Sequence, residues 1–263
     1  MKIKDVVRYL DEVFHPEYQE EYDNAGFLLG DSSAEYRGTL VALDLTPTVI
    51  DEALKASDVN LIVTHHPFIY RGLRRITDGD AAGWMAGTLL RHGISVYAAH
   101  TNLDNLAWGV SGALAERLGL DHCRVLRPSV ADDIGGGMVG ELPSAMATRD
   151  FLMLVRRRLG LPCVRYAGTR RTVCRVALCG GSGSFLIDDA LAAGADIYLT
   201  GDLKYHDYQA VTRYLSPTMV LADIGHYESE QFAKEIIYHT ILKKFSNFAC
   251  RISEKQGSLV SYI

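Results

Sequence analysis

Two adjacent histidines, His65 and His66, are the residues of this chain whose types and position first suggest chemistry. They follow a short apolar run at 59–63, whose β-branched residues predict a buried strand of an α/β sheet, and Pro67 stops that strand from continuing. Ligand sites of open α/β sheets lie beyond the carboxyl ends of the strands, and neutral imidazole is the commonest metal ligand. The pair therefore suggests a metal site. Taken alone, it fits equally well with two histidines that cap a strand beside water.

Two later segments place further metal-ligand types after predicted strands. His100 and Asp104 lie just beyond a strand predicted at 94–98, and His226 and Glu230 lie at the start of a predicted helix. Since His226 and Glu230 are four residues apart, a helix puts them on the same face. If the strand ends meet at one edge, they assemble a mixed imidazole and carboxylate set. Such a set suits zinc, iron, manganese or nickel and does not select one of them.

Each of these residues also has a purely structural explanation. Asp104 precedes a predicted helix and is a candidate for its N-cap, and His100 is a candidate for a buried, hydrogen-bonded histidine. Glu228 and Glu230 fall in the first turn of a helix, where the helix dipole favours a negative charge. Each structural explanation is adequate for one residue, but the recurrence of ligand types at several strand ends favours a metal site.

Helix and strand signals alternate through most of the chain, which predicts an α/β fold with parallel or mixed sheets. We expect strands at 38–44, 59–64, 94–98, 138–142, 163–166, 173–178 and 259–262, and helices at 6–14, 48–56, 81–92, 106–118, 149–159 and 184–193. The segment 223–230 is expected to lead into a long helix that ends at about residue 244. Pro128 and the run Gly135-Gly136-Gly137 interrupt the alternation, so we predict a linker at 127–137. The expected domains are then 1–126 and 127–263.

The second half of the chain partly repeats the first. Residues 40–43 correspond to 175–178, residues 50–54 to 187–191, and residues 61–64 to 197–200. Where the first copy has His65 and His66, the second has Gly201 and Asp202. A duplication would give two similar lobes with the metal chemistry built mainly on one. A shared strand-helix-strand plan without duplication explains the same pattern.

Composition excludes several classes of protein. The net charge of −5 lacks the basic excess of a dedicated duplex-binding protein, so we do not expect nucleic acid as a partner. No apolar run of about 18 residues is present, so we expect no membrane association. The N-terminal pattern is that of an amphipathic helix rather than a signal peptide. Five scattered cysteines without a C-x-x-C pair favour a reducing, cytoplasmic environment.

Five segments together resemble the NIF-three-like family, whose members are often labelled GTP cyclohydrolase 1 type 2 homologues. They are Asp23-Asn24-Ala25-Gly26, Thr64-His65-His66-Pro67-Phe68, His100-Thr101-Asn102-Leu103-Asp104, Thr200-Gly201-Asp202 and Gly225-His226-Tyr227-Glu228-Ser229-Glu230. The resemblance runs in order from about residue 5 to the C-terminus. It implies two α/β lobes with mixed sheets, a dinuclear metal centre in the cleft between them, and a toroidal homohexamer. The short segment between the lobes resembles the compact form of the family, which lacks an inserted domain.

The same resemblance implies a set of metal ligands. One ion would be held by His66, Asp104 and Glu230, and the other by His65, His226 and Glu230, so that Glu230 bridges two divalent ions. His100 would lie close by, as a neighbour of the ligands or an occasional ligand. Two metal ions can activate water without a separate general base. Glu228 and His100 are the candidates if a catalytic base exists.

Two further segments are candidates for anion binding, and only the first of them favours it. Arg71, Arg74 and Arg75 follow the histidine pair in a segment that contains Gly72. Guanidinium groups on a bendable segment could form a basic lid over a phosphate, and a solvated charged surface is the alternative. The run 180–183, Gly-Gly-Ser-Gly, lacks the lysine of a phosphate-binding loop. It therefore favours a plain tight turn between a strand and a helix.

These observations favour a metal-dependent hydrolase acting on a small anionic or nucleotide-like molecule. By family label, the reaction would be a cyclohydrolase-like cleavage of C–N bonds. The ligand set is equally compatible with a non-catalytic metal store, insertase or chaperone. A regulatory scaffold is the third alternative, and the acidic charge balance argues against its binding nucleic acid.

Overall fold

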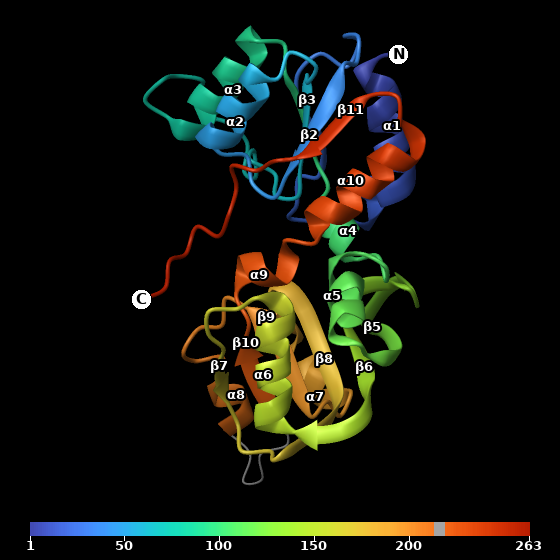
Figure 1. Ribbon diagram of the computed structural model, residues 1–263, viewed down its shortest axis with the longest axis vertical. Helices are drawn as coiled ribbons and strands as arrows, with labels where there is room; N and C mark the ends of the chain where they lie inside the picture. Colours follow the sequence, from blue (N-terminus) through green and yellow to red (C-terminus); the bar gives the residue numbers. More distant parts are fainter. Residues whose placement is uncertain (213–218) are drawn as a thin grey trace. The chain divides into compact units, whose positions relative to one another are not determined.

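The computed structural model describes residues 1–212 and 219–263, which fold into two compact units (Figure 1). The first unit comprises Met1–Leu103 and Ala233–Gly257, and the second comprises Asp104–Phe232 and Ser258–Ile263. These bounds differ from the expected halves, 1–126 and 127–263. Residues 233–257 belong to the first unit because they supply an edge strand of its sheet and one of the helices that pack on that sheet.

The first unit is a five-stranded mixed sheet with helices on both faces. Its elements are α1 (Ile3–Phe14), η1 (Pro16–Tyr18), β1 (Gly26–Leu29), β2 (Gly38–Ala42), α2 (Pro47–Lys55), β3 (Leu61–Thr64), α3 (Ala81–Arg91), β4 (Ser95–Ala98), α4 (Thr101–Asp104, which ends at the first residue of the second unit), α10 (Ala233–Lys244) and β11 (Ala249–Ile252). The strand order is β1-β4-β3-β2-β11, and only β1 is antiparallel to its neighbour.

Burial explains the composition of the central strands. Every residue of β2, β3 and β4 is buried, as expected for parallel strands covered on both faces. Figure 1 shows α2 and α3 on one face of this sheet and α1 and α10 on the other. On the first face, Ile50, Leu89 and Ile62 belong to one apolar cluster. On the second, α1 contributes Val6 and Leu10, which are fully buried at helical spacing.

The second unit is a six-stranded mixed sheet in the order β5-β6-β8-β9-β10-β7. Its elements are α5 (Val110–Leu118), β5 (Asp121–Ala131), β6 (Ile134–Ala147), α6 (Thr148–Leu159), β7 (Arg165–Ala167), β8 (Thr172–Ser182), η2 (Ser184–Leu186), α7 (Ile187–Ala192), β9 (Ile197–Gly201), α8 (Gln209–Thr212), β10 (Val220–Asp223) and α9 (His226–Glu230). Strands β8, β9 and β10 are parallel, and the outer pairs are antiparallel.

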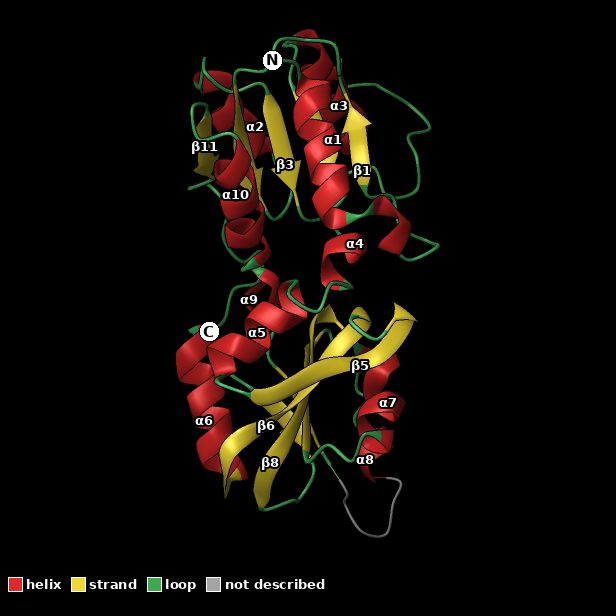
Figure 2. Cartoon of the chain, turned by 90° about the vertical axis from the view of Figure 1, so that its right-hand side faces the viewer, coloured by secondary structure: helices red, strands yellow, loops and turns green. Residues whose placement is uncertain are grey.

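Two apolar clusters lie on opposite faces of this second sheet. One joins Leu114 of α5 and Phe151 of α6 to strand residues such as Val176. The other joins Leu186 and Ala190, of η2 and α7, to the opposite face. Figure 2 shows α6 and α7 on opposite sides of the strands. The first sheet therefore carries four parallel strands and the second carries three, with helices on either face of each, which is the mixed α/β architecture expected from the alternating signals.

Several predicted elements need correction. The expected linker at 127–137 lies in the hairpin of β5 and β6, where the glycines are strand residues. Gly135 has a φ of 151° and pairs with Pro128, and a Cβ there would lie 2.1 Å from the carbonyl oxygen of Arg127. The glycine run thus permits close strand pairing rather than flexibility.

The C-terminal part of the chain also differs from expectation. The closing strand expected at 259–262 is instead β11, whereas 259–262 contain no regular element. The long helix expected up to about residue 244 is divided into α9 and α10. Among the helices of residues 1–212 and 219–263, none combines the length and apolarity needed to cross a membrane.

Candidate metal centre

In the first unit, the carboxyl ends of three parallel strands bring polar side chains to one edge of the sheet. Thr64, the last residue of β3, pairs with Ala42 of β2 and Ala98 of β4, so these strands end in register. Two residues after β2 stands Asp44, and two residues after β4 stands His100. Directly after β3 come the two adjacent histidines. The strand register alone therefore gathers three imidazoles and a carboxylate.

The three histidine rings form a compact cluster. The ring centroid of His65 lies 4.9 Å from that of His66 and 5.3 Å from that of His100, and the centroids of His66 and His100 are 5.4 Å apart. One ring nitrogen from each lies within 4.8 Å of the other two, a spacing that could hold a metal ion. His65 is fully buried, and the other two are partly exposed. His100 therefore lies directly beside the histidine pair.

A hydrogen bond at Nδ1 orients each of these rings. The acceptor for His65 is the carbonyl oxygen of Ala99, at 2.7 Å. His66 is 2.6 Å from Oδ1 of Asp44, and His100 is 2.7 Å from Oδ1 of Asp23. A carbonyl or carboxylate oxygen can only accept, so the proton of the neutral ring sits on Nδ1 and Nε2 carries the lone pair. This arrangement is typical of metal-ligating histidines.

The two aspartates that orient these rings are themselves held in place. Asp23 has a fully buried side chain and accepts hydrogen bonds from the amides of Asn24 and Thr101 and from the Thr101 hydroxyl. Burial raises its pKa, but the contact with His100 and these hydrogen bonds outweigh burial and lower the pKa to about 2. Asp44 accepts a hydrogen bond of 2.8 Å from Nε2 of Gln256.

Sequence reasoning gave neither aspartate a role. Asp23 lies in one of the quoted family motifs, and Asp44 ends a predicted strand, so each position carried a signal. That signal was incomplete because pairing with a particular ring depends on strand register, which the sequence pattern does not specify.

The second unit carries Asp104, His226 and Glu230. Because α9 begins at His226, one helical turn brings Nε2 of His226 within 3.0 Å of Oε2 of Glu230. A carboxylate oxygen of Asp104 lies within 4.8 Å of one of Glu230. The Glu230 side chain is only 6% exposed, so its charge is held away from bulk water. This unit therefore presents one imidazole and two carboxylates, which are three of the five ligands implied by the family resemblance.

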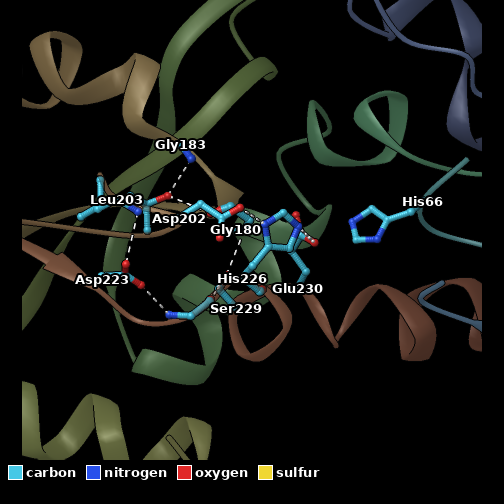
Figure 3. A network of polar contacts seen from close by, with 12 residues as sticks. His66, Gly180, Gly183, Asp202, Leu203, Asp223, His226, Ser229 and Glu230 are labelled. Carbon is cyan, nitrogen blue, oxygen red and sulfur yellow. Dashed lines mark hydrogen bonds and ion pairs between the residues drawn. The ribbon is translucent and has the colours of Figure 1, made fainter. Parts of the chain in front are cut away.

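Asp202 positions His226 from the opposite side (Figure 3). Its Oδ2 lies 2.7 Å from Nδ1 of His226, so the ring is held between two carboxylates. Burial lowers the pKa of His226, but Glu230 and Asp202 outweigh burial and raise it to about 9. The metal-free ring is therefore protonated at neutral pH. Asp202 adopts a left-handed φ of 55° just after β9, a conformation that aspartate tolerates better than most residues.

The glycine-rich segment 180–183 lies against Glu230. Two of its amides have protein acceptors, since Gly181 donates to the Ser229 hydroxyl at 2.9 Å and Gly183 donates to that of Thr200 at 2.8 Å. Gly181 has a φ of 61°, and a Cβ there would lie 1.8 Å from Oε1 of Glu230. These contacts favour a tight turn over a phosphate-binding loop, and the turn leaves room for the Glu230 carboxylate.

The remaining candidates lie elsewhere. Glu228 is buried, and its carboxylate packs against the turn at Gly225, where a Cβ would lie 2.2 Å from Oε2. Arg74 and Arg75 are exposed in the segment between β3 and α3, which contains no regular element. Neither observation assigns these residues a catalytic or substrate-binding role, which stays a prediction.

The chain belongs to the Duf34/NIF3 family (NGG1p interacting factor 3), whose model matches residues 1–257. A Clostridium perfringens protein named GTP cyclohydrolase 1 type 2 homolog is 34% identical over 232 residues, covering 88% of this chain and 87% of its own. A Streptomyces coelicolor protein of the same name is 34% identical over 235 residues, covering 87% and 81%.

Solved structures agree with this membership. A hypothetical protein from Staphylococcus aureus matches with a TM-score of 0.90 at 28% identity, covering 100% of this chain and 99% of its own. A Bacillus cereus protein related to NIF3 matches with a TM-score of 0.90 at 21% identity, covering 100% and 99%, and at that identity it supports the fold alone. The resemblance inferred from the sequence motifs, and the fold that it implies, are confirmed.

Proposed function

We propose that this protein binds two divalent transition-metal ions per subunit and uses them to hydrolyse a small anionic or nucleotide-like substrate. The proposed ligands are His65, His66, Asp104, His226 and Glu230, with Glu230 shared by both ions. The observation that carries the proposal is the set of three histidines in the first unit, each with Nδ1 bound to a fixed acceptor. Rings held in this way present Nε2 lone pairs to a metal without further rearrangement.

The chemistry of the donors supports transition metals over calcium or magnesium. Imidazole suits zinc, iron and nickel, and carboxylates extend the set to manganese. Held by these residues, two such ions would supply Lewis-acid chemistry toward water and toward a developing negative charge. The protein's own contribution is orientation: Asp44, Asp23 and Asp202 fix three of the rings. The relatives' name, GTP cyclohydrolase 1 type 2 homolog, suggests C–N bonds as the target.

Metal content tests the proposal directly. Protein purified without chelator should contain about two transition-metal ions per chain by elemental analysis. Replacing the shared ligand, in Glu230→Gln, should lose both ions, whereas His65→Ala should lose mainly one. His239→Ala is the matched control, because His239 is exposed on α10. Absence of metal from the wild type after metal-replete expression would refute the proposal, and equal losses in the two variants would refute the shared role of Glu230.

Turnover distinguishes an enzyme from a metal-binding protein without catalysis. Metal-restored protein should hydrolyse some member of a panel that includes nucleotides, cyclic amidines and phosphate esters, and Glu230→Gln should abolish that activity. Full metal content with no turnover across the panel would instead identify a metal store, insertase or chaperone.

The proposed oligomeric state follows from the family resemblance, and the proposed cellular compartment follows from the cysteines. We propose a homohexamer by resemblance. All five cysteines are free, and a reducing cytoplasm is the compartment in which free thiols persist.

A further inference from the structure

A pocket of about 400 Å³ lies on the second unit beside α6. The pocket's walls come from the exposed side of that helix and from the segment that leads into β7, the edge strand of the sheet. It is lined by Arg149, Leu152, Met153, Arg156, Pro162, Cys163, Val164 and Tyr166. None of these residues belongs to the proposed metal ligands or their orienting partners. The volume falls within the range typical of small-molecule sites.

The charge of this pocket is positive. Arg149 and Arg156 line it, and among the described residues none of those lining it is acidic. Nε of Arg156 donates to the carbonyl oxygen of Leu161 at 3.2 Å, which fixes the guanidinium at the pocket wall. A second depression of about 370 Å³ shares Met153 and Arg156 and adds Arg157, so the positive surface continues beyond the pocket.

The rest of the pocket is apolar. Met153 is 52% exposed and Tyr166 is 54% exposed, although side chains of this size usually bury more of their surface in a folded protein. Leu152 and Pro162 complete this wall. An inorganic anion would contact the arginines and leave the apolar wall in water, whereas a neutral apolar molecule would leave two guanidinium groups unused.

We infer that this pocket binds a small organic anion with an apolar body, whose carboxylate, sulfonate or phosphate pairs with Arg149 and Arg156. The apolar body lies against Met153 and Tyr166. Guanidinium groups bind such anions bidentately, and a thioether and an aromatic ring supply adaptable apolar contacts. This site is independent of the proposed metal chemistry, because it involves different residues.

A matched pair of fluorescent probes tests the inference on the full chain. The anionic probe is 8-anilinonaphthalene-1-sulfonate, and the neutral probe is N-phenyl-1-naphthylamine, which has the same apolar body without the sulfonate. The double variant Arg149→Gln/Arg156→Gln should bind the anionic probe at least tenfold more weakly than the wild type does. Its affinity for the neutral probe should change less than twofold. Arg158→Gln should keep the affinities for both probes within twofold of the wild-type values, because Arg158 lies on the same helix but does not line the pocket. Equal affinity of the anionic probe for the double variant and the wild type would overturn the inference.

Cysteine labelling locates the probe. Cys163 lines the pocket and is exposed, and Cys123 is exposed elsewhere on the same unit. Saturating anionic probe should slow the alkylation of Cys163 by iodoacetamide at least threefold, measured by peptide mass spectrometry, with no change at Cys123. Equal rates at Cys163 with and without probe would overturn the location. Competition by benzoate, phenyl phosphate and decanoate then shows which acid group and which apolar body the site prefers, and failure of all three to compete would overturn the ligand class.

Discussion

The ion pairs around His226 should make metal binding strongly dependent on pH. Between Asp202 and Glu230, this ring has a pKa of about 9 in the metal-free protein. A metal ion binds the deprotonated ring, so below pH 9 binding must displace a proton. Apparent affinity should therefore rise with pH and level off above pH 9. The same proton stabilises the metal-free fold fully below pH 6.5, the ordinary histidine value, and that stabilisation is lost as pH rises through 9.

The size of the effect follows from the pKa and the exposure of the pair. Well below the pKa, each pH unit lowers the affinity tenfold, and the ring is half protonated at pH 9, so a fully coupled ring would change the affinity about fiftyfold between pH 7 and pH 9. However, the His226 side chain is 35% exposed and that of Asp202 is 55% exposed, so solvent screens part of the interaction. We expect a change of about tenfold over this interval.

Calorimetry can count the displaced proton. Zinc titrations at pH 7 in two buffers of different ionisation enthalpy should show nearly one proton released from His226 of the wild type and a smaller fraction of a proton from Asp202→Asn, in which Glu230 alone still raises the pKa of the ring. Asparagine retains the left-handed backbone at that position, so the fold should survive. Asp188→Asn removes the same charge from an exposed position of α7 and should behave like the wild type. A metal-free His226 that titrates near pH 6.5 by NMR, or an affinity that is flat from pH 7 to pH 9, would refute the reasoning.

Three further predictions concern the other residues described. Asp44→Asn should lower metal affinity 10- to 100-fold in competition with a chelating dye while the melting temperature stays near that of the wild type, because Asp44 orients His66 without being a proposed ligand; unchanged affinity would contradict that role. Arg74→Ala/Arg75→Ala should leave metal content unchanged and weaken phosphate-bearing ligands by about 1.5–3 kcal/mol for each charged hydrogen bond lost, with neutral ligands as the control; equal binding by the variant would identify these arginines as an ordinary solvated surface. Light scattering at micromolar concentration should give a mass near six times 29.0 kDa, and a monomer would contradict the proposed hexamer.

The elements near the histidines were predictable because their signals are local. Strand β3 and helix α2 fall within a few residues of expectation, since an apolar β-branched run and a helix with a threonine N-cap need no long-range information. The family motifs then extended that reasoning to ligands that are distant in sequence.

What could not be predicted depends on pairing between distant segments. The glycines at 135–137 indicated a linker because their role, close packing against β5, exists only after the hairpin forms. The same holds for β11, which completes the first sheet by pairing with β2 across more than two hundred residues. Asp44 and Asp23 were missed as partners of histidines for the same reason, because each contacts a histidine ring that is distant in the sequence.

The absence of a side chain at Gly181 has a consequence for how relatives of this protein are compared. Glu230 occupies space that a Cβ at that position would take, and the φ of 61° adds a backbone reason for glycine. A relative could therefore keep every proposed ligand and still lose the position of the carboxylate that corresponds to Glu230, through one methyl group at a residue that is not a proposed ligand. Retention of function across the family should thus be judged by this glycine together with the histidines and carboxylates. A survey restricted to donor atoms would not detect relatives in which this carboxylate is displaced.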